Sequence, residues 1–143
     1  MDMIEKARKV IYCLEQDGVD KDYEVTDKTE NSIILQTCKE IAGIKCAIGI
    51  IFNNSPYTLI EVCIGELRNL NNEPLLLSLL NDINRDQLAV KYYYCKNVGI
   101  VMARLTYIAL DNEFNGSLLY NLQLVAEDFI KCEIKNIIRI LDM

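Results

Sequence analysis

The alternation of apolar residues between residues 44 and 52 is the feature that most restricts how this chain can fold. Every second position there is apolar, namely Ile44, Cys46, Ile48, Ile50 and Phe52. Successive side chains of a strand point to opposite faces of a sheet, so this period of two predicts a half-buried strand. The chain is therefore expected to build a sheet that packs one face against a core.

Further strand patterns lie on both sides of this segment. Residues 32–41 and 57–67 are rich in apolar and β-branched side chains, and short turns at Gly43 and at 53–56 separate the three strands. Short turns of this kind predict an antiparallel meander. A hairpin is expected later, from 90–95 and 100–108 with Gly99 in its turn. The polar segment 19–31 reads as turns, in which 23–26 could form a short strand.

Three segments have helical periodicity. The first is 3–16, which ends before Gly18, and the second begins at Asn71 or Asn72 and ends near Asn84. The third begins at 115–117 and keeps an apolar face as far as Leu141. The order α-βββ-α-ββ-α predicts an α+β fold in which an antiparallel five-stranded sheet packs against helices. With no repeat or linker, residues 1–143 are expected to form a single domain.

The charge and the cysteines of the chain restrict its expected binding partners and cellular compartment. The net charge is −6, from 15 basic and 21 acidic residues, and no basic run interrupts it. Binding to nucleic acid or to an anionic membrane is therefore not expected. The chain begins without a signal-peptide pattern, has no apolar stretch of membrane-spanning length and scatters its six cysteines, so we expect a cytoplasmic protein with free, mostly buried thiols.

The chain lacks the residues that most kinds of catalytic site require. The chain has no histidine, no phosphate-binding glycine motif and no close cysteine pair, so no catalytic, cofactor-binding or metal-binding residue is predicted. The carboxylates available for an unrecognised enzyme are best explained as solvated surface groups: Asp82, Asp86, Asp111, Glu113, Glu127 and Asp128. Cys95, next to Lys96, is the most exposed candidate nucleophile. Glu61 lies in an apolar strand, where a cross-strand pair with Lys45 or Arg104 is expected.

Two features favour contacts with another protein. The stretch 118–126 of the last helix has no charged residue and carries more apolar surface than one helix needs, which indicates burial against a second helix, a partner chain, or both. Three successive tyrosines occur at 92–94, where a strand would direct Tyr92 and Tyr94 to one face and Tyr93 to the other. The residues predicted to bind a protein partner or to form a dimer are Leu75, Leu76, Leu79, Leu80, Tyr92 and Tyr94.

The run LLNDIN at residues 79–84 ends a leucine-rich helix directly before the strand at 90–94. In this run and in the order of its elements, the chain resembles the YbjN-type family of bacterial proteins, whose fold is similar to that of type III secretion chaperones. The resemblance implies a non-enzymatic role. Secretion chaperones are typically small acidic homodimers that hold an extended segment of another protein, whereas YbjN-like proteins are described as sensory or regulatory.

The sequence leaves three functions open. The preferred hypothesis is a non-enzymatic protein-binding module, chaperone-like or regulatory, that acts as a homodimer. A sensor for a small apolar ligand would instead need an apolar cavity between sheet and helices. An enzyme that works through carboxylates or Cys95 is the third hypothesis, and it would need a deep pocket lined by titratable groups.

Overall fold

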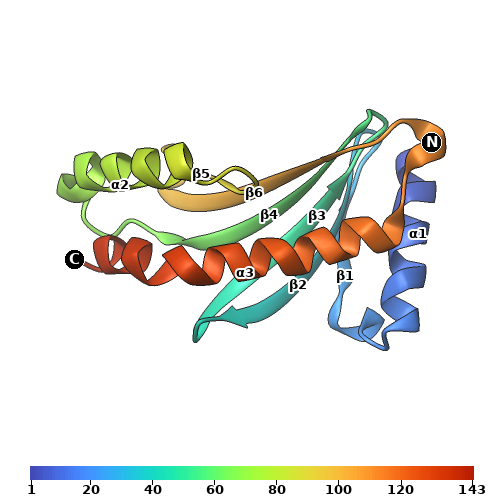
Figure 1. Ribbon diagram of the computed structural model, residues 1–143, viewed down its shortest axis with the longest axis horizontal. Coiled ribbons are helices and arrows are strands. Elements are labelled where there is room, and N and C mark those ends of the chain that lie inside the picture. Colours follow the sequence, from blue (N-terminus) through green and yellow to red (C-terminus); the bar gives the residue numbers. More distant parts are fainter.

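The computed structural model describes all residues, 1–143, and contains one six-stranded antiparallel sheet with three helices (Figure 1). The strands are β1 (Glu24–Lys28), β2 (Ile33–Ile41), β3 (Ile44–Phe52), β4 (Tyr57–Glu66), β5 (Lys91–Cys95) and β6 (Ile100–Ile108). Their order across the sheet is β1-β2-β3-β4-β6-β5. The sheet is thus a meander of four strands extended by the β5–β6 hairpin, and the α+β class is confirmed.

The prediction of five strands was wrong because β1 is a strand of the sheet. All five residues of β1 are exposed, and only Val25 among them is strongly apolar. A strand at the edge of a sheet needs no buried side and is commonly protected by charged side chains, so it lacks the alternation that reveals a half-buried strand. β1 pairs with Ile33 to Gln36 of β2, with an irregularity between Val25 and Asp27.

Tight turns set the register of the central strands. Ile41 of β2 pairs with Ile44 of β3, and the two residues between them, Ala42 and Gly43, both have positive φ, 51° and 80°. Two-residue hairpins favour this conformation because its twist matches that of the strands. Gly43 adopts it readily, whereas alanine rarely does. The register places Cys46, Ile48, Ile50 and Phe52 on one face of the sheet.

The three helices are α1 (Met3–Gln16), α2 (Glu73–Asp86) and α3 (Gly116–Leu141). Two of them begin with an N-capping side chain. The side chain of Asp2 accepts a hydrogen bond from the backbone N–H of Glu5, and that of Asn115 accepts one from the backbone N–H of Leu118. Pro74 lies in the first turn of α2, where its missing N–H costs nothing. These boundaries confirm the predicted helices to within two or three residues. No helix combines the length and the apolarity that a membrane span requires.

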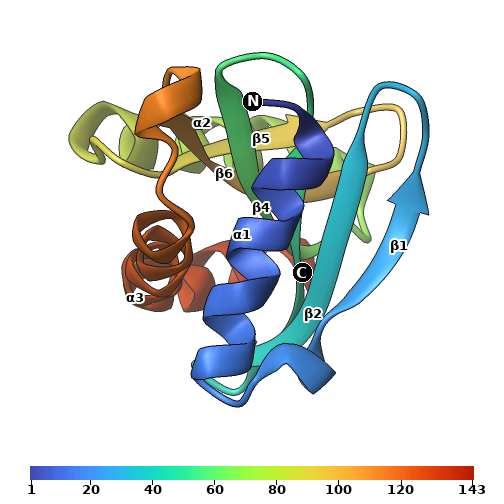
Figure 2. The ribbon, with the colours of Figure 1, turned by 90° about the vertical axis from the view of Figure 1, so that its right-hand side faces the viewer.

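The helices lie against one face of the sheet. α1 contacts β2 and β3, α3 contacts β2, β4 and β6, and α2 packs between α3 and β5. Figure 1 shows α3 crossing the strands, and Figure 2 shows α1 and α3 together beside the sheet. We call this the covered face. Its core side chains include Ile48, Ile50, Ile60, Val62 and Val101, each at most 1% exposed.

Close contacts fix α1 against its neighbours. The side chain of Lys6 is 2% exposed, and its ammonium group donates to the backbone oxygens of Asn53, at 3.0 Å, and of Ser55. Gly116 begins α3 so close to α1 that a Cβ there would lie 2.8 Å from the backbone oxygen of Lys9. Desolvation by burial lowers the pKa of Lys6. The charge is retained in the interior because backbone oxygens solvate it.

Candidate protein-binding surfaces

The second face of the sheet carries no helix, and we call it the open face. Along each of the strands β2 to β6, the residues that alternate with the core are half-buried or exposed. The side chains of the open face include Ile34, Gln36, Cys38, Ala47, Ile51, Leu59, Glu61, Cys63, Tyr93, Met102 and Arg104, together with Gly49, and the charged residues Glu40, Lys45, Glu66 and Lys91 lie on it nearer the strand ends.

Apolar residues form rows across the open face. Ile34 of β2 pairs with Ile51 of β3, and Ile51 pairs with Leu59 of β4. A second row joins Cys63 to Met102 and Met102 to Tyr93. Cross-strand neighbours of this kind lie within about 4.5–5.5 Å of each other at Cβ, so each row is a continuous apolar strip. The face is therefore more apolar than a solvated sheet surface needs to be.

A charged cluster lies between these rows. Arg104 donates to Glu61 Oε1 from Nη2, at 2.7 Å, and from Nε, at 3.1 Å, while the Tyr93 hydroxyl donates to Glu61 Oε2 at 2.9 Å. The Glu61 side chain is only 13% exposed and that of Arg104 is 41% exposed. Burial, and then the hydrogen bond to Glu61, raises the pKa of Tyr93. The predicted cross-strand pair of Glu61 is confirmed with Arg104, whereas Lys45 lies opposite Glu40.

Gly49 lies beside this cluster and brings no side chain to it. It pairs with Gln36 on one side and with Glu61 on the other, at the centre of the open face. A Cβ placed on Gly49 would meet only Ile34 Cγ2, at 3.6 Å, which is an ordinary van der Waals contact. A side chain at position 49 would therefore project outward and leave the monomer undisturbed.

The second apolar surface is a flank of α3, formed by Leu118, Leu122, Val125 and Phe129. Leu118, Val125 and Phe129 are 46%, 42% and 38% exposed, and Leu122 is half-buried. The four residues are spaced by four, three and four positions, so they lie in one line along the helix. The predicted surplus of apolar surface on this helix is confirmed, and we call this line the α3 flank.

Basic residues follow on the second half of α3. Lys131, Lys135 and Arg139 are all exposed and recur every four residues, which places them in a row along the helix. None of the three takes part in an ion pair within the chain. In a protein with a net charge of −6, this row is a local concentration of positive charge.

The residues predicted to bind a partner divide between core and surface. Leu76, Leu80 and Tyr92 are at most 3% exposed, and Leu79 and Tyr94 are partly buried against the same core. Leu75, at 49% exposed, is the one of the six that lies largely in solvent. Tyr92 and Tyr94 share a face and Tyr93 takes the other, as predicted. A role of these residues in binding stays a prediction, but the folded monomer uses most of them for packing.

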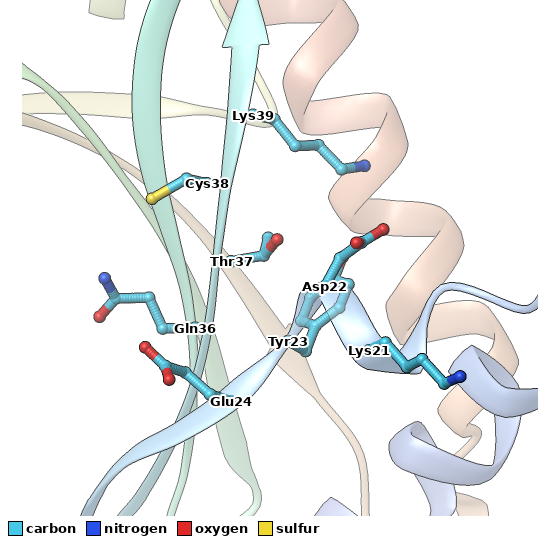
Figure 3. Close-up of a pocket in the computed structure, with 8 residues that line it drawn as sticks. All are labelled: Lys21, Asp22, Tyr23, Glu24, Gln36, Thr37, Cys38 and Lys39. Carbon is cyan, nitrogen blue, oxygen red and sulfur yellow. The ribbon is translucent and has the colours of Figure 1, made fainter.

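A polar cleft of about 340 Å³ lies where β1 stops pairing with β2, and Figure 3 shows its lining. Thr37 lines it with a buried hydroxyl that has no hydrogen-bond partner. Next to it, Gln123 Nε2 donates to the Tyr23 hydroxyl at 2.7 Å, and burial raises the pKa of Tyr23 to about 12. Two further clefts, of about 580 and 230 Å³, are also lined mainly by polar residues. These clefts give no support to a site for an apolar ligand.

The candidate nucleophiles differ from expectation. Most cysteines are not buried: Cys46 alone is, whereas Cys38 and Cys132 are exposed and Cys95 is half-buried. The prediction that Cys95 is the most exposed candidate was therefore wrong: it is the last residue of β5, on the same face as Tyr93 and paired with Ile100, and it is half-buried. Burial raises the pKa of Cys46 to about 11, which keeps that thiol protonated and unreactive.

Several of the candidate carboxylates form ion pairs with basic groups of the chain. Asp82 and Asp86 both contact Arg85, whose hydrogen bond and charge lower the pKa of Asp86. Glu127 binds Lys39 at 3.1 Å, and Asp111 pairs with the N-terminal amine. Asp111, Glu113 and Asp128 are exposed. The interpretation of these groups as solvated or ion-paired surface residues agrees with this geometry.

Comparison with solved structures finds the same fold in YbjN from E. coli, a protein described as a candidate transcription regulator. The two structures superpose with a TM-score of 0.59 over 92% of this chain and 87% of YbjN, at 15% sequence identity. The chain has a YbjN-type fold. No protein-family model matches the sequence, and no curated protein does so. At this identity the likeness concerns the fold alone, so the two surfaces above must be interpreted from their own residues.

Proposed function

We propose that this protein is a non-enzymatic protein-binding module with a regulatory or chaperone-like role, and that it acts as a homodimer. The observation that carries this proposal is the α3 flank. Folding buries the inner side of α3, including Leu119, Ala126 and Ile130, yet leaves Leu118, Val125 and Phe129 in solvent. A line of exposed large apolar residues lowers the solubility of a monomer, so such a line favours a surface that another molecule covers.

The spacing of the α3 flank favours a helix as its partner. A line of apolar residues separated by four and three positions is the side that helices present to one another, because ridges of one helix fill the grooves of the other. The partner segment would carry a matching apolar stripe. Lys131, Lys135 and Arg139 lie further along α3 and on a neighbouring side of the helix, so acidic residues of a partner that extends past the stripe would find opposite charges there. We therefore propose an amphipathic helix with an acidic flank as the ligand.

The solved relative supports a regulatory role. YbjN is described as a candidate transcription regulator, and a chain with a net charge of −6 is poorly suited to contact the phosphate backbone itself. Regulation through another protein is compatible with both facts. The six free cysteines agree with a reducing compartment, and we place the protein in the cytoplasm.

The α3 flank can be tested by capturing a partner with matched variants. Tagged protein would be incubated with lysate of its host, using the natural sequence, Phe129→Glu and Leu77→Glu as the control. Leu77 is an exposed leucine of α2, 45% exposed against 38% for Phe129, so both changes place a charge on a helix surface. Leu76 would be a poor choice because it is fully buried.

We expect one protein to be recovered in stoichiometric amount with the natural sequence and with Leu77→Glu, and to be lost with Phe129→Glu. Cross-linking should place the contact on a helical, acidic segment of that protein. Equal recovery with all three baits, or recovery of the bait alone, would contradict the proposal. Circular dichroism of each variant establishes that the fold is retained.

A further inference from the structure

We propose that the open face is the surface through which two copies of this chain associate, sheet against sheet. The inference rests on the homodimer of the proposed function and names its interface. It concerns a different surface from the α3 flank, which lies with the helices along the covered side of the sheet. Each surface then has its own occupant: a second copy for the open face and a partner helix for α3.

The area of the open face is that of a stable interface. β2, β3, β4 and β6 have nine or ten residues each, and β5 adds a fifth strand at the edge. With about 3.3 Å per residue and about 4.8 Å between strands, these strands present a flat area of roughly 600–700 Å² before side-chain relief is added. Stable protein interfaces bury about 800 Å² on each partner. A single small ligand or a lone helix would cover much less of it.

The charge of the open face favours a second copy over an oppositely charged partner. Among β2 to β6 this face carries three basic residues, Lys45, Lys91 and Arg104, and three acidic ones, Glu40, Glu61 and Glu66. The edge strand β1 adds Glu24 and Asp27, which gives the face three basic and five acidic residues and a net charge of −2. Two copies with a net charge of −6 each repel over most of their surface, and this face is where they can approach.

The charged cluster at the centre suits a symmetric contact. Arg104 uses Nε and Nη2 for Glu61 and Tyr93, and its Nη1 has no partner within the monomer. A two-fold axis brings the same patch of both copies together, so each Arg104 can donate from Nη1 to the other copy. The apolar rows on either side of the cluster would pack against each other, as the inner faces of a β-sandwich do at about 10 Å.

The first experiment is the solution mass of three variants. The natural chain should sediment at twice its 16.4 kDa mass, and Gly49→Arg and Ile51→Arg should sediment as monomers. A side chain at 49 meets only Ile34, so Gly49→Arg blocks the open face without strain in the monomer. Val25→Arg is the control: it also places an arginine on a strand, but Val25 pairs with Leu35 of the covered face and is 53% exposed. This variant should remain a dimer.

A second measurement needs no variant. Cys38 lies on the open face and Cys132 lies on α3, and both are exposed in the monomer. Alkylation of Cys38 should slow several-fold as protein concentration rises, while Cys132 reacts at a constant rate. A natural chain that stays monomeric, dimers that persist in Gly49→Arg and Ile51→Arg, or equal rates for both thiols would overturn the inference. Partner capture through α3 is read separately, so loss of the dimer and loss of the partner are distinguishable.

Discussion

The two faces of the sheet are built from the same strands and differ in what covers them. In β3, Ile48 and Ile50 are fully buried under the helices, whereas Ala47, Gly49 and Ile51 alternate with them and remain accessible. The covered face needs its apolar side chains, because they form the core. The open face carries isoleucine, leucine and methionine without that requirement, and the difference indicates a surface retained for binding.

The most direct test of the difference between the two faces is to truncate one residue on each. Ile48→Ala should reduce the free energy of unfolding by about 2–5 kcal/mol, because it leaves a cavity where Ile48 is 0% exposed. Ile51→Ala, three residues further along the same strand, should cost about 1 kcal/mol or less in dilute solution, since Ile51 is half-buried. Urea unfolding followed by circular dichroism measures both. Similar losses for the two variants would mean that the open face supports the monomer fold as the core does.

Glycines provide the second comparison. Gly116→Ala places a methyl group 2.8 Å from the backbone oxygen of Lys9, which must move away and separate α1 from α3. We expect a loss of about 1–3 kcal/mol in the free energy of unfolding, as is usual for overpacking. In Gly49→Ala the new methyl group would lie 3.6 Å from Ile34 Cγ2, which is an ordinary contact. The free energy of unfolding should therefore stay the same or rise slightly. Thermal unfolding of the two variants compares them. A stable Gly116→Ala variant would show that the contact between the helices is loose.

The adjacent tyrosines of β5 separate the faces by their response to pH. Burial raises the pKa of Tyr92, and its hydroxyl has no partner. A tyrosine in the unfolded chain ionises near pH 10, which is below the pKa of the buried Tyr92. Above pH 10 the unfolded chain therefore releases this proton before the folded chain does, and the free energy of unfolding falls by up to about 1.4 kcal/mol per pH unit. Tyr92→Phe should therefore leave stability at pH 7 almost unchanged and reduce the loss at pH 11.

Tyr93→Phe is the matched control, because Tyr93 faces the open side and donates to Glu61 at 2.9 Å. It should cost about 1 kcal/mol at pH 7 through the lost hydrogen bond. Urea unfolding at pH 7 and pH 11 checks both variants. An alkaline loss of stability that Tyr92→Phe does not reduce would place its cause elsewhere, in the lysines or in Tyr23 and Tyr93, whose pKa values are also raised.

Much of the fold was predictable from the sequence because its signals are local. The alternation in β3, the helix start at Asn115 and the glycine at 43 each act within a few residues, and the structure uses them as expected. β1 was considered only as a possible short strand at 23–26 and was not counted in the sheet, for the opposite reason. This segment becomes a strand only because it pairs with the edge of β2. The signal for the strand is therefore in the sequence of β2 and not in that of β1.

The surfaces were only partly predictable. The uncharged stretch 118–126 indicated surplus apolar surface on the last helix, and the structure confirms it at Leu118 and Val125. Leu76 and Leu80 were expected at an interface but lie in the core, because periodicity shows that a residue is on an apolar side without showing what covers that side. The alternation placed Ile51 and Leu59 on the faces opposite to the core, but it could not show that the two residues are neighbours, because their pairing follows from the register of β3 and β4. The polar neighbours Lys39 and Glu40 were the local signal for the exposure of Cys38.

The smallest expected effect concerns the pair of Glu61 and Arg104. A double-mutant cycle with Glu61→Gln and Arg104→Gln should give a coupling energy of about 0.5–1 kcal/mol in dilute solution, and salt should reduce it, because the Arg104 side chain is 41% exposed and water screens the pair. The Glu61–Arg104 cycle also tests what covers the open face. If two copies meet there, the coupling should rise with protein concentration as water leaves the cluster. A coupling that is the same at all concentrations would mean that the pair remains in solvent and that the open face is free.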